Sequence, residues 1–334
     1  MKQQKINLGI TCGDINGIGI EIVIKAFQDP ILFDLCIPVL YVPLSVFDFY
    51  KQLFNSGNII YRSIQNSFDA SPHQLNIVSF SQENIPLNPG ISTEFASTIA
   101  IQSIDLALND FKKKHIDLIV TLPVNKKNIS LTCKKFVGHT EYFSAAFSHT
   151  PNIMLLCNNS FKIATLTNHI PISLVSSQVT RSRVKEKISI LLDVFQKDFV
   201  IQKPKIALLS LNPHAGDEGL IGKEDDEVIS PVVKEFICAN KFIYGPFSAD
   251  AFFGTQSYKK YDAVLALYHD QALIPFKALS FGAGVNYTAG LPVIRVSPDH
   301  GVAYDIAGKG LASASSLSAA ICLAIKIHHN RLLN

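Results

Sequence analysis

Three histidines each come shortly after an apolar run of the kind that forms a buried strand. His169 follows KIATLT, His214 follows IALLSLN and His269 follows DAVLALY. Ligands of α/β proteins bind at the carboxyl ends of strands, and three neutral imidazoles with one open position make a competent catalytic metal site. Because the spacing carries no local signature, a purely structural role for each imidazole stays open at this point.

Two acidic residues could support such a metal site. Asp270 directly follows His269, and Asp250 lies in the string SADAFF. A carboxylate that accepts a hydrogen bond from a metal-binding histidine fixes its tautomer and raises its basicity. The alternative is that each carboxylate simply stabilises the first turn of a helix, and both interpretations remain open.

A second group of residues could bind an anion. The string GHTE, with His139 and Thr140, precedes the helix-like YFSAAF. Thr140 could be an ordinary N-cap, or the backbone N–H groups and these two side chains could capture an anion. Lys277 and Arg295 lie in the apolar strings PFKAL and LPVIRVS, and Asn286 lies between them. A charge among apolar residues is costly unless it is paired, although long stems can also pack on a core with the charge in water.

The elements that must position these residues alternate along the chain. Apolar runs predict strands at 6–11, 37–42, 75–80, 117–122, 205–211 and 262–268. Runs at 153–157 and 162–167 flank Asn-Asn-Ser and predict a hairpin, while Ser92 or Thr93 and Thr180 predict helix starts. The fold class is therefore α/β with a mixed or mostly parallel sheet, and 334 residues predict two domains. The glycine loop at 13–19 and the string GKGLAS only approach known nucleotide-binding patterns.

Composition limits the class of protein. Hydrophobic residues make up 48% and charged residues 17%, with a net charge of +3, so we expect a packed globular protein that does not bind nucleic acid. The six cysteines are widely spaced with no CxxC pair, which is typical of buried thiols in a reducing compartment. The start of the chain has no long apolar run, and the apolar stretch 31–47 is interrupted by Asp34, Pro38 and Pro43. We therefore expect no signal peptide and no membrane span, and a cytoplasmic location.

Taken together, several strings resemble the PdxA family, the 4-hydroxythreonine-4-phosphate dehydrogenases of vitamin B6 (pyridoxine and pyridoxal phosphate) biosynthesis. They are GDINGIGIEI, TLPVNKK, GHTEYF, NHIP, LNPHAG, YHDQALIPFK, GVNYTAGLPVIR and SPDHGVAYDIAGKG. They run in family order over nearly the whole chain, and as a set they are highly specific. The family is related to isocitrate and isopropylmalate dehydrogenases, whose cofactor loop is similar to HGVAYDIAGKG.

The resemblance implies an architecture and a set of site residues. It implies homodimers of two-domain α/β subunits with the active site in the interdomain cleft. One domain would comprise 1–135 and 299–334, and the other, 136–298, would carry the metal ligands and the dimer interface. The implied metal ligands, shared between subunits, are His169, His214 and His269; the implied substrate contacts are His139, Thr140, Lys277, Asn286 and Arg295; and the implied cofactor contacts are His300 and Asp305.

The implied reaction is an NAD(P)-dependent, metal-assisted oxidation and decarboxylation. It converts 4-phosphooxy-L-threonine to 3-amino-2-oxopropyl phosphate with zinc, magnesium or cobalt. The choice between NAD and NADP, the metal, the general base, and which cation binds phosphate and which carboxylate stay open. So do three alternatives: a paralogous dehydrogenase for a phosphorylated sugar acid such as 4-phosphoerythronate or for a dihydrodiol acid, a phosphate acyltransferase-like enzyme, and a non-catalytic binding protein.

The chain departs from the family pattern in one loop. The family usually has GDPAGIG or GEPAGIG, whereas this chain has Ile15 and Asn16 in place of Pro and Ala, and Cys12 shortly before them. We expect these changes to alter the stiffness of the loop and the fine positioning of substrate. They remove none of the implied ligands.

Overall fold

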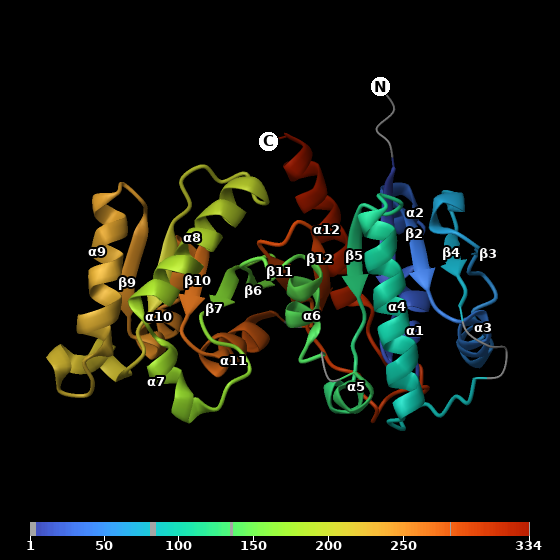
Figure 1. Ribbon diagram of the computed structural model, residues 1–334, viewed down its shortest axis with the longest axis horizontal. Coiled ribbons are helices and arrows are strands. Elements are labelled where there is room, and N and C mark those ends of the chain that lie inside the picture. The colour runs from blue at the N-terminus through green and yellow to red at the C-terminus, as the bar shows by residue number, and fades with distance from the viewer. Residues whose placement is uncertain (1–4, 81–84, 134–135, 281, 334) are drawn as a thin grey trace. The chain divides into compact units, whose positions relative to one another are not determined.

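The computed structural model describes residues 5–80, 85–133, 136–280 and 282–333, and the chain divides into two compact units. The first unit comprises Met1–Thr150 and Leu291–His329, and the second comprises Pro151–Gly290 and Asn330–Asn334 (Figure 1). The expected boundaries at 135/136 and 298/299 are therefore displaced in the structure.

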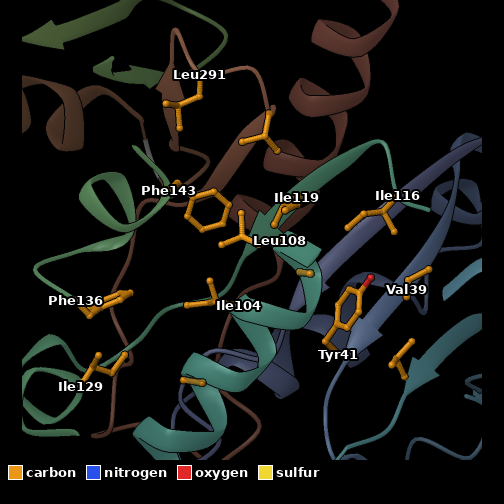
Figure 2. Close-up of a cluster of buried hydrophobic side chains, with 14 of the residues drawn as sticks. Val39, Tyr41, Ile104, Leu108, Ile116, Ile119, Ile129, Phe136, Phe143 and Leu291 are labelled. Carbon is orange, nitrogen blue, oxygen red and sulfur yellow. The ribbon is translucent and has the colours of Figure 1, made fainter. Parts of the chain in front are cut away.

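The core of the first unit explains the displaced boundaries. Helix α6 (His139–Ala146) buries Phe143 in a hydrophobic cluster that also contains Ile104 and Leu108. Figure 2 shows Phe143 beside Leu108 of the long helix α4 (Glu94–Lys112). Leu291 joins the same cluster, so the chain belongs to the first unit well before residue 299.

In the first unit, the described strands pair parallel in the order β3-β4-β2-β1-β5-β12. Apart from the edge strand β3, its strands are almost entirely buried, as in parallel sheets whose two faces are both covered. The elements of this unit are β1 (Ile6–Thr11), α1 (Gly19–Ala26), α2 (Ile31–Leu35), β2 (Cys36–Tyr41), α3 (Leu44–Leu53), β3 (Tyr61–Ile64), β4 (Leu75–Val78), α4 (Glu94–Lys112), β5 (Leu118–Thr121), α5 (Lys126–Thr132), α6, β12 (Arg295–Pro298) and most of α12 (Ser315–Leu333).

Helix α4 forms where the sequence predicts it. Thr93 is extended and its hydroxyl accepts a hydrogen bond from the N–H of Ala96 at 3.2 Å, which is an N-cap. The helix contacts β1, β2 and β5 through the apolar face that contains Ala100, Ile104 and Ala107. The predicted helix start is confirmed, and Thr93 rather than Ser92 is the cap.

The second unit has a mixed sheet in the order β11-β6-β7-β10-β8-β9. Strands β11, β6 and β7 pair antiparallel, and β7, β10, β8 and β9 pair parallel. The hairpin of β6 and β7 confirms the prediction from the sequence. The elements are β6 (Ile153–Cys157), β7 (Lys162–Thr165), α7 (Val175–Gln178), α8 (Arg181–Lys197), β8 (Ile206–Leu209), α9 (Ser230–Cys238), β9 (Ile243–Phe247), α10 (Ala249–Gly254), β10 (Ala263–Ala266), α11 (His269–Ser280) and β11 (Val285–Ala289).

A buried polar cluster holds the end of the chain in this unit. Asp198 is 1% exposed and accepts hydrogen bonds from the hydroxyl of Tyr287 and from Nε of Arg331, the latter at 2.6 Å. Asn330 donates to the backbone carbonyl of Asp198 at 2.7 Å. The carboxylate is therefore paired as a buried charge must be, and the last turn of α12 is fixed by it.

Among the described residues, no helix is long and apolar enough to cross a bilayer.

Candidate active site

The three candidate metal-binding histidines lie at one edge of the second unit's sheet. His169 follows β7, His269 follows β10 and His214 follows β8, and these three strands are parallel neighbours in that sheet. Because the carboxyl ends of adjacent parallel strands share an edge, the topology brings the three loops to the same side.

His169 and His269 line one pocket of about 250 Å³. Their ring centroids are 5.5 Å apart and the rings are inclined by 47°. His269 donates from Nδ1 to the carboxylate of Asp270 at 2.7 Å, which leaves Nε2 with its lone pair. A carboxylate that fixes the tautomer in this way is the usual support of a metal-binding histidine, so the pair has the chemistry that a divalent ion requires.

His214 lies on a different loop and does not line this pocket. Its neighbour is Asp250, whose pKa is lowered mainly by the hydrogen bond from Ser248, with a contribution from the charge of His214. Across residues 5–80, 85–133, 136–280 and 282–333 of the single chain, no group of three or more His, Cys, Asp or Glu side chains is arranged to hold a metal ion. One chain therefore brings two of the three histidines together.

The two acidic candidates differ in what they contact. Asp270 bonds directly to His269, as expected of a carboxylate that supports a metal ligand. Asp250 is in the first turn of α10, two residues after the N-cap Ser248, so the helix-start interpretation also describes its position. His214 acts on Asp250 through its charge. Among the described residues, no hydrogen bond joins the two side chains.

Arg295 is the charged anion-binding candidate of the first unit. This guanidinium is 2% exposed and donates from Nε to the hydroxyl of Thr121 at 3.0 Å and from Nη2 to the same oxygen. It also lies over the ring of Phe143, 5.9 Å from its centroid. Burial lowers the pKa of Arg295 to about 9, although the charge of Glu141 opposes this. A buried cation with this environment favours an anionic ligand.

His139 lies at the start of α6. Burial lowers its pKa well below the usual value, and the charges of Arg295 and Lys126 act in the same direction. The imidazole is therefore neutral at neutral pH, and its Nε2 is covered and has no hydrogen-bond partner within the described part of the chain. A buried nitrogen of this kind is a site where a ligand can complete the hydrogen bonding.

The structure corrects the N-cap interpretation of Thr140. Helix α6 begins at His139 and its N-cap position is Gly138, and no side chain within the described ranges caps it. Thr140 thus lies inside the first turn. Lys126, at the start of α5, is close enough for its charge to lower the pKa of His139, and the sequence does not single it out because a lysine in the loop string TLPVNKK has no distinguishing local signal.

Lys277 and Asn286 belong to the second unit. Lys277 is exposed in the last turn of α11 and, among the described residues, forms no ion pair within 4.0 Å. Asn286 is in β11, half-buried, and its Oδ1 is covered with no hydrogen-bond partner in the described ranges. Both residues are available to a polar ligand.

The loop with the candidate cofactor residues His300 and Asp305 packs on the glycine loop of the first unit. The N–H of Ile18 donates to the carbonyl of Val302 at 3.1 Å, and a Cβ at Gly17 would lie 2.9 Å from that carbonyl oxygen. Only glycine permits this approach. His300 has a covered Nε2 with no partner in the described part of the chain, and Asp305 is exposed.

Two contacts that the sequence did not suggest fix this loop. The hydroxyl of Tyr304 donates to Asp14 at 2.6 Å. Lys25 donates to the carbonyls of Gly310 and Ala312, both at 2.7 Å. Burial raises the pKa of Asp14, and the bond from Tyr304 partly offsets this. The glycine loop at 13–19 therefore supports the candidate cofactor loop through its contacts with Val302 and Tyr304.

Comparisons with known proteins agree with one another. The model of the family described as "Pyridoxal phosphate biosynthetic protein PdxA" matches residues 34–324. A 4-hydroxythreonine-4-phosphate dehydrogenase of Bacteroides thetaiotaomicron is 40% identical over 333 residues, 99% of this chain and 91% of that protein. One from Prosthecochloris aestuarii is 36% identical, with 97% of each covered. The crystal structure of the Klebsiella pneumoniae enzyme superimposes with a TM-score of 0.84 at 31% identity, covering 98% of each chain.

The fold and these relatives define the class of protein as an α/β dehydrogenase. The chain belongs to the PdxA family. Its activity is that of a 4-hydroxythreonine-4-phosphate dehydrogenase, an oxidoreductase of pyridoxal phosphate biosynthesis. The α/β fold predicted from the sequence is confirmed.

Proposed function

We propose that this chain catalyses the NAD(P)-dependent oxidation and decarboxylation of 4-phosphooxy-L-threonine to 3-amino-2-oxopropyl phosphate and CO₂. We further propose that one divalent ion, zinc, magnesium or cobalt, is held at each site by the imidazoles of His169, His214 and His269. The observation that carries the metal site is the pocket that His169 and His269 share, with the carboxylate of Asp270 on His269.

The three histidine ligands of one metal ion come from two copies of the chain. A single chain places His169 and His269 in one pocket and His214 on another loop, so a second copy supplies the third imidazole. The same region exposes apolar side chains of the kind that homodimer interfaces cover. They include Ile172 at 72%, Leu220 at 84% and Ile274 at 70% exposed.

When bound, the ion supplies Lewis-acid assistance at the alcohol and the nicotinamide supplies the hydride acceptor. The residues of this chain bind and orient the substrate. Arg295 and the donors of His139 and Thr140 bind one anionic group of the substrate, and the neutral imidazole of His139 adds a hydrogen bond without another charge. Lys277 and Asn286 are further substrate contacts.

The remaining residues serve the cofactor and the ligands. His300 and Asp305 contact the nicotinamide cofactor from the loop that Tyr304 and Asp14 hold. Asp270 keeps His269 in the tautomer that leaves Nε2 free to bind a metal. The six cysteines are all free thiols, which suits a reducing compartment and supports the proposed cytoplasmic location.

The test follows reduced nicotinamide and CO₂ together. Purified protein is incubated with 4-phosphooxy-L-threonine, NAD⁺ or NADP⁺, and zinc, magnesium or cobalt in turn. Equimolar reduced nicotinamide and CO₂ are expected, with turnover lost on chelation and restored by metal. His214→Ala should lose both metal and turnover and keep its fold, whereas His73→Ala, an exposed histidine far along the chain, should keep both. Turnover by His214→Ala at the wild-type rate would contradict the metal assignment.

A further inference from the structure

The loop that carries His214 has an unusual backbone. Residues 214–218 all have positive φ, with values of 53° for His214, 54° for Ala215, 85° for Gly216, 46° for Asp217 and 56° for Glu218. Left-handed residues normally occur singly, because Cβ crowds the following carbonyl. Four of these five residues carry a Cβ, so the turn persists only where its surroundings hold it.

One buried carboxylate holds the residues that lead into this turn. Asp225 is 0% exposed, and its Oδ1 accepts a hydrogen bond from the N–H of Leu211 at 2.8 Å. Its Oδ2 accepts from the N–H and from the side-chain amide of Asn212, each at 3.0 Å. In the described part of the chain, Asp225 has no Lys, Arg or His within 4.0 Å. Three amide donors therefore stabilise a buried charge, and all three belong to the two residues before Pro213.

The link from these residues to His214 is short and stiff. Asn212 is extended, with φ −97° and ψ 155°, as residues before proline usually are. Pro213 has its own φ fixed by its ring. Few backbone torsions remain between the anchored amides and the Cα of His214, so the position of Asp225 constrains the backbone from which the imidazole extends.

The far side of the turn is closed as tightly. The N–H of Ile221 donates to the carbonyl of Gly216 at 3.1 Å, and a Cβ at Gly216 would lie 2.5 Å from the carbonyl oxygen of Gly222. Asn212 also donates to Glu224 at 3.0 Å. The π-helical turn Asp225–Ile229, a rare element that is frequent at functional sites, follows directly.

We propose that Asp225 is a positioning residue for His214, and that the left-handed turn 214–218 holds this imidazole where it can bind the metal. This inference rests on the proposed role of His214 as a metal ligand. Asp225 itself does not touch the metal. It acts through the backbone of Leu211 and Asn212.

The test uses Co²⁺ alone, without substrate or cofactor. Its dissociation constant and visible absorption spectrum are measured for the wild type, Asp225→Asn, His214→Ala and the control Asp226→Asn, whose carboxylate is an exposed neighbour. Asp225→Asn should weaken Co²⁺ binding about 10-fold or more, as losses of supporting groups do, and change the spectrum of the bound ion. Asp226→Asn should match the wild type.

A second variant separates positioning from general stability. Glu218→Gly lets an exposed left-handed residue relax, so it should raise the midpoint of denaturation and still weaken Co²⁺ binding at least 3-fold. If Asp225→Asn fails to fold, Glu218→Gly and Asn212→Ala carry the test, and wild-type Co²⁺ affinity in both overturns the inference.

The outcomes distinguish the two proposals. Wild-type Co²⁺ binding by His214→Ala would refute the proposed metal site, whatever Asp225 does. Loss of binding in His214→Ala together with wild-type affinity and spectrum in folded Asp225→Asn would leave the metal site standing and refute the positioning role.

Discussion

Replacing Arg295 by methionine should stabilise the ligand-free protein and remove its ability to bind anions. The guanidinium is 2% exposed in β12, and burial lowers its pKa to about 9. The folded chain thus keeps a charge where water cannot solvate it. The methionine side chain is flexible and apolar, and it can fill most of the space that the arginine side chain occupies in the core.

The size of the effect follows from the pKa. The pKa of Arg295 lies roughly 3 to 4 below the ordinary guanidinium value. At about 1.4 kcal/mol for each unit, burying this charge destabilises the folded protein by at most roughly 5 kcal/mol. The variant loses the hydrogen bonds to Thr121, at about 1–1.5 kcal/mol for each bond, together with the attraction to Glu141 and the other contacts of the guanidinium. The net gain in the free energy of unfolding should be about 1–3 kcal/mol, within the range for replacing buried charges by apolar groups.

The assay is urea denaturation of the ligand-free protein at neutral pH, repeated with inorganic phosphate. Phosphate should stabilise the wild type by about 2.7 kcal/mol at 100 times its dissociation constant, and should have no effect on Arg295→Met. The control is Arg62→Met, since Arg62 is exposed in β3, and it should change stability by less than about 0.5 kcal/mol.

A destabilisation of Arg295→Met by more than about 1 kcal/mol without ligand would refute this reasoning. It would mean that the interactions of the guanidinium outweigh its desolvation. Retained stabilisation of the variant by phosphate would show separately that the anion binds elsewhere.

Three other predictions concern stability and the candidate cofactor loop. Because burial lowers the pKa of His139, its neutral form contributes stability above about pH 6.5 that is lost as pH falls below it, at most about 1.4 kcal/mol per pH unit; in His139→Gln, urea denaturation between pH 7 and 5 should show a flatter decline, and an unchanged slope would count against the neutral imidazole. Tyr304→Phe removes the hydrogen bond to Asp14, so it should raise the KM for NAD(P)⁺ and cost about 1–3 kcal/mol of stability; unchanged KM in steady-state kinetics would show that the loop does not serve the cofactor. Arg331→Met leaves the carboxylate of Asp198 buried without its cation, so thermal unfolding should report a loss of about 2–4 kcal/mol, and wild-type stability would contradict the anchoring role of that pair.

Local signals in the sequence were sufficient for many elements. The hairpin of β6 and β7 follows from two apolar runs around Asn-Asn-Ser, and Thr93 and Thr180 cap α4 and α8 through hydroxyl bonds to an N–H three residues on. These features depend on neighbouring residues, so the sequence expresses them directly. The N-cap predicted at Thr140 is wrong, because a glycine N-cap without a side-chain hydrogen bond has no sequence signal of its own.

The sequence by itself determined the family, the strand-end positions of His169, His214 and His269, and the class of chemistry, because residue types and short strings carry that information. Only the tertiary structure decided which groups meet. It pairs His169 with His269 in one pocket and joins Tyr304 to Asp14, residues far apart along the chain. It also determines the left-handed backbone conformation of 214–218. Residue preferences do not predict this conformation, because a run of residues with a Cβ keeps positive φ only when surrounding contacts impose it. Long-range contacts and the burial that alters pKa values arise only when the chain is packed.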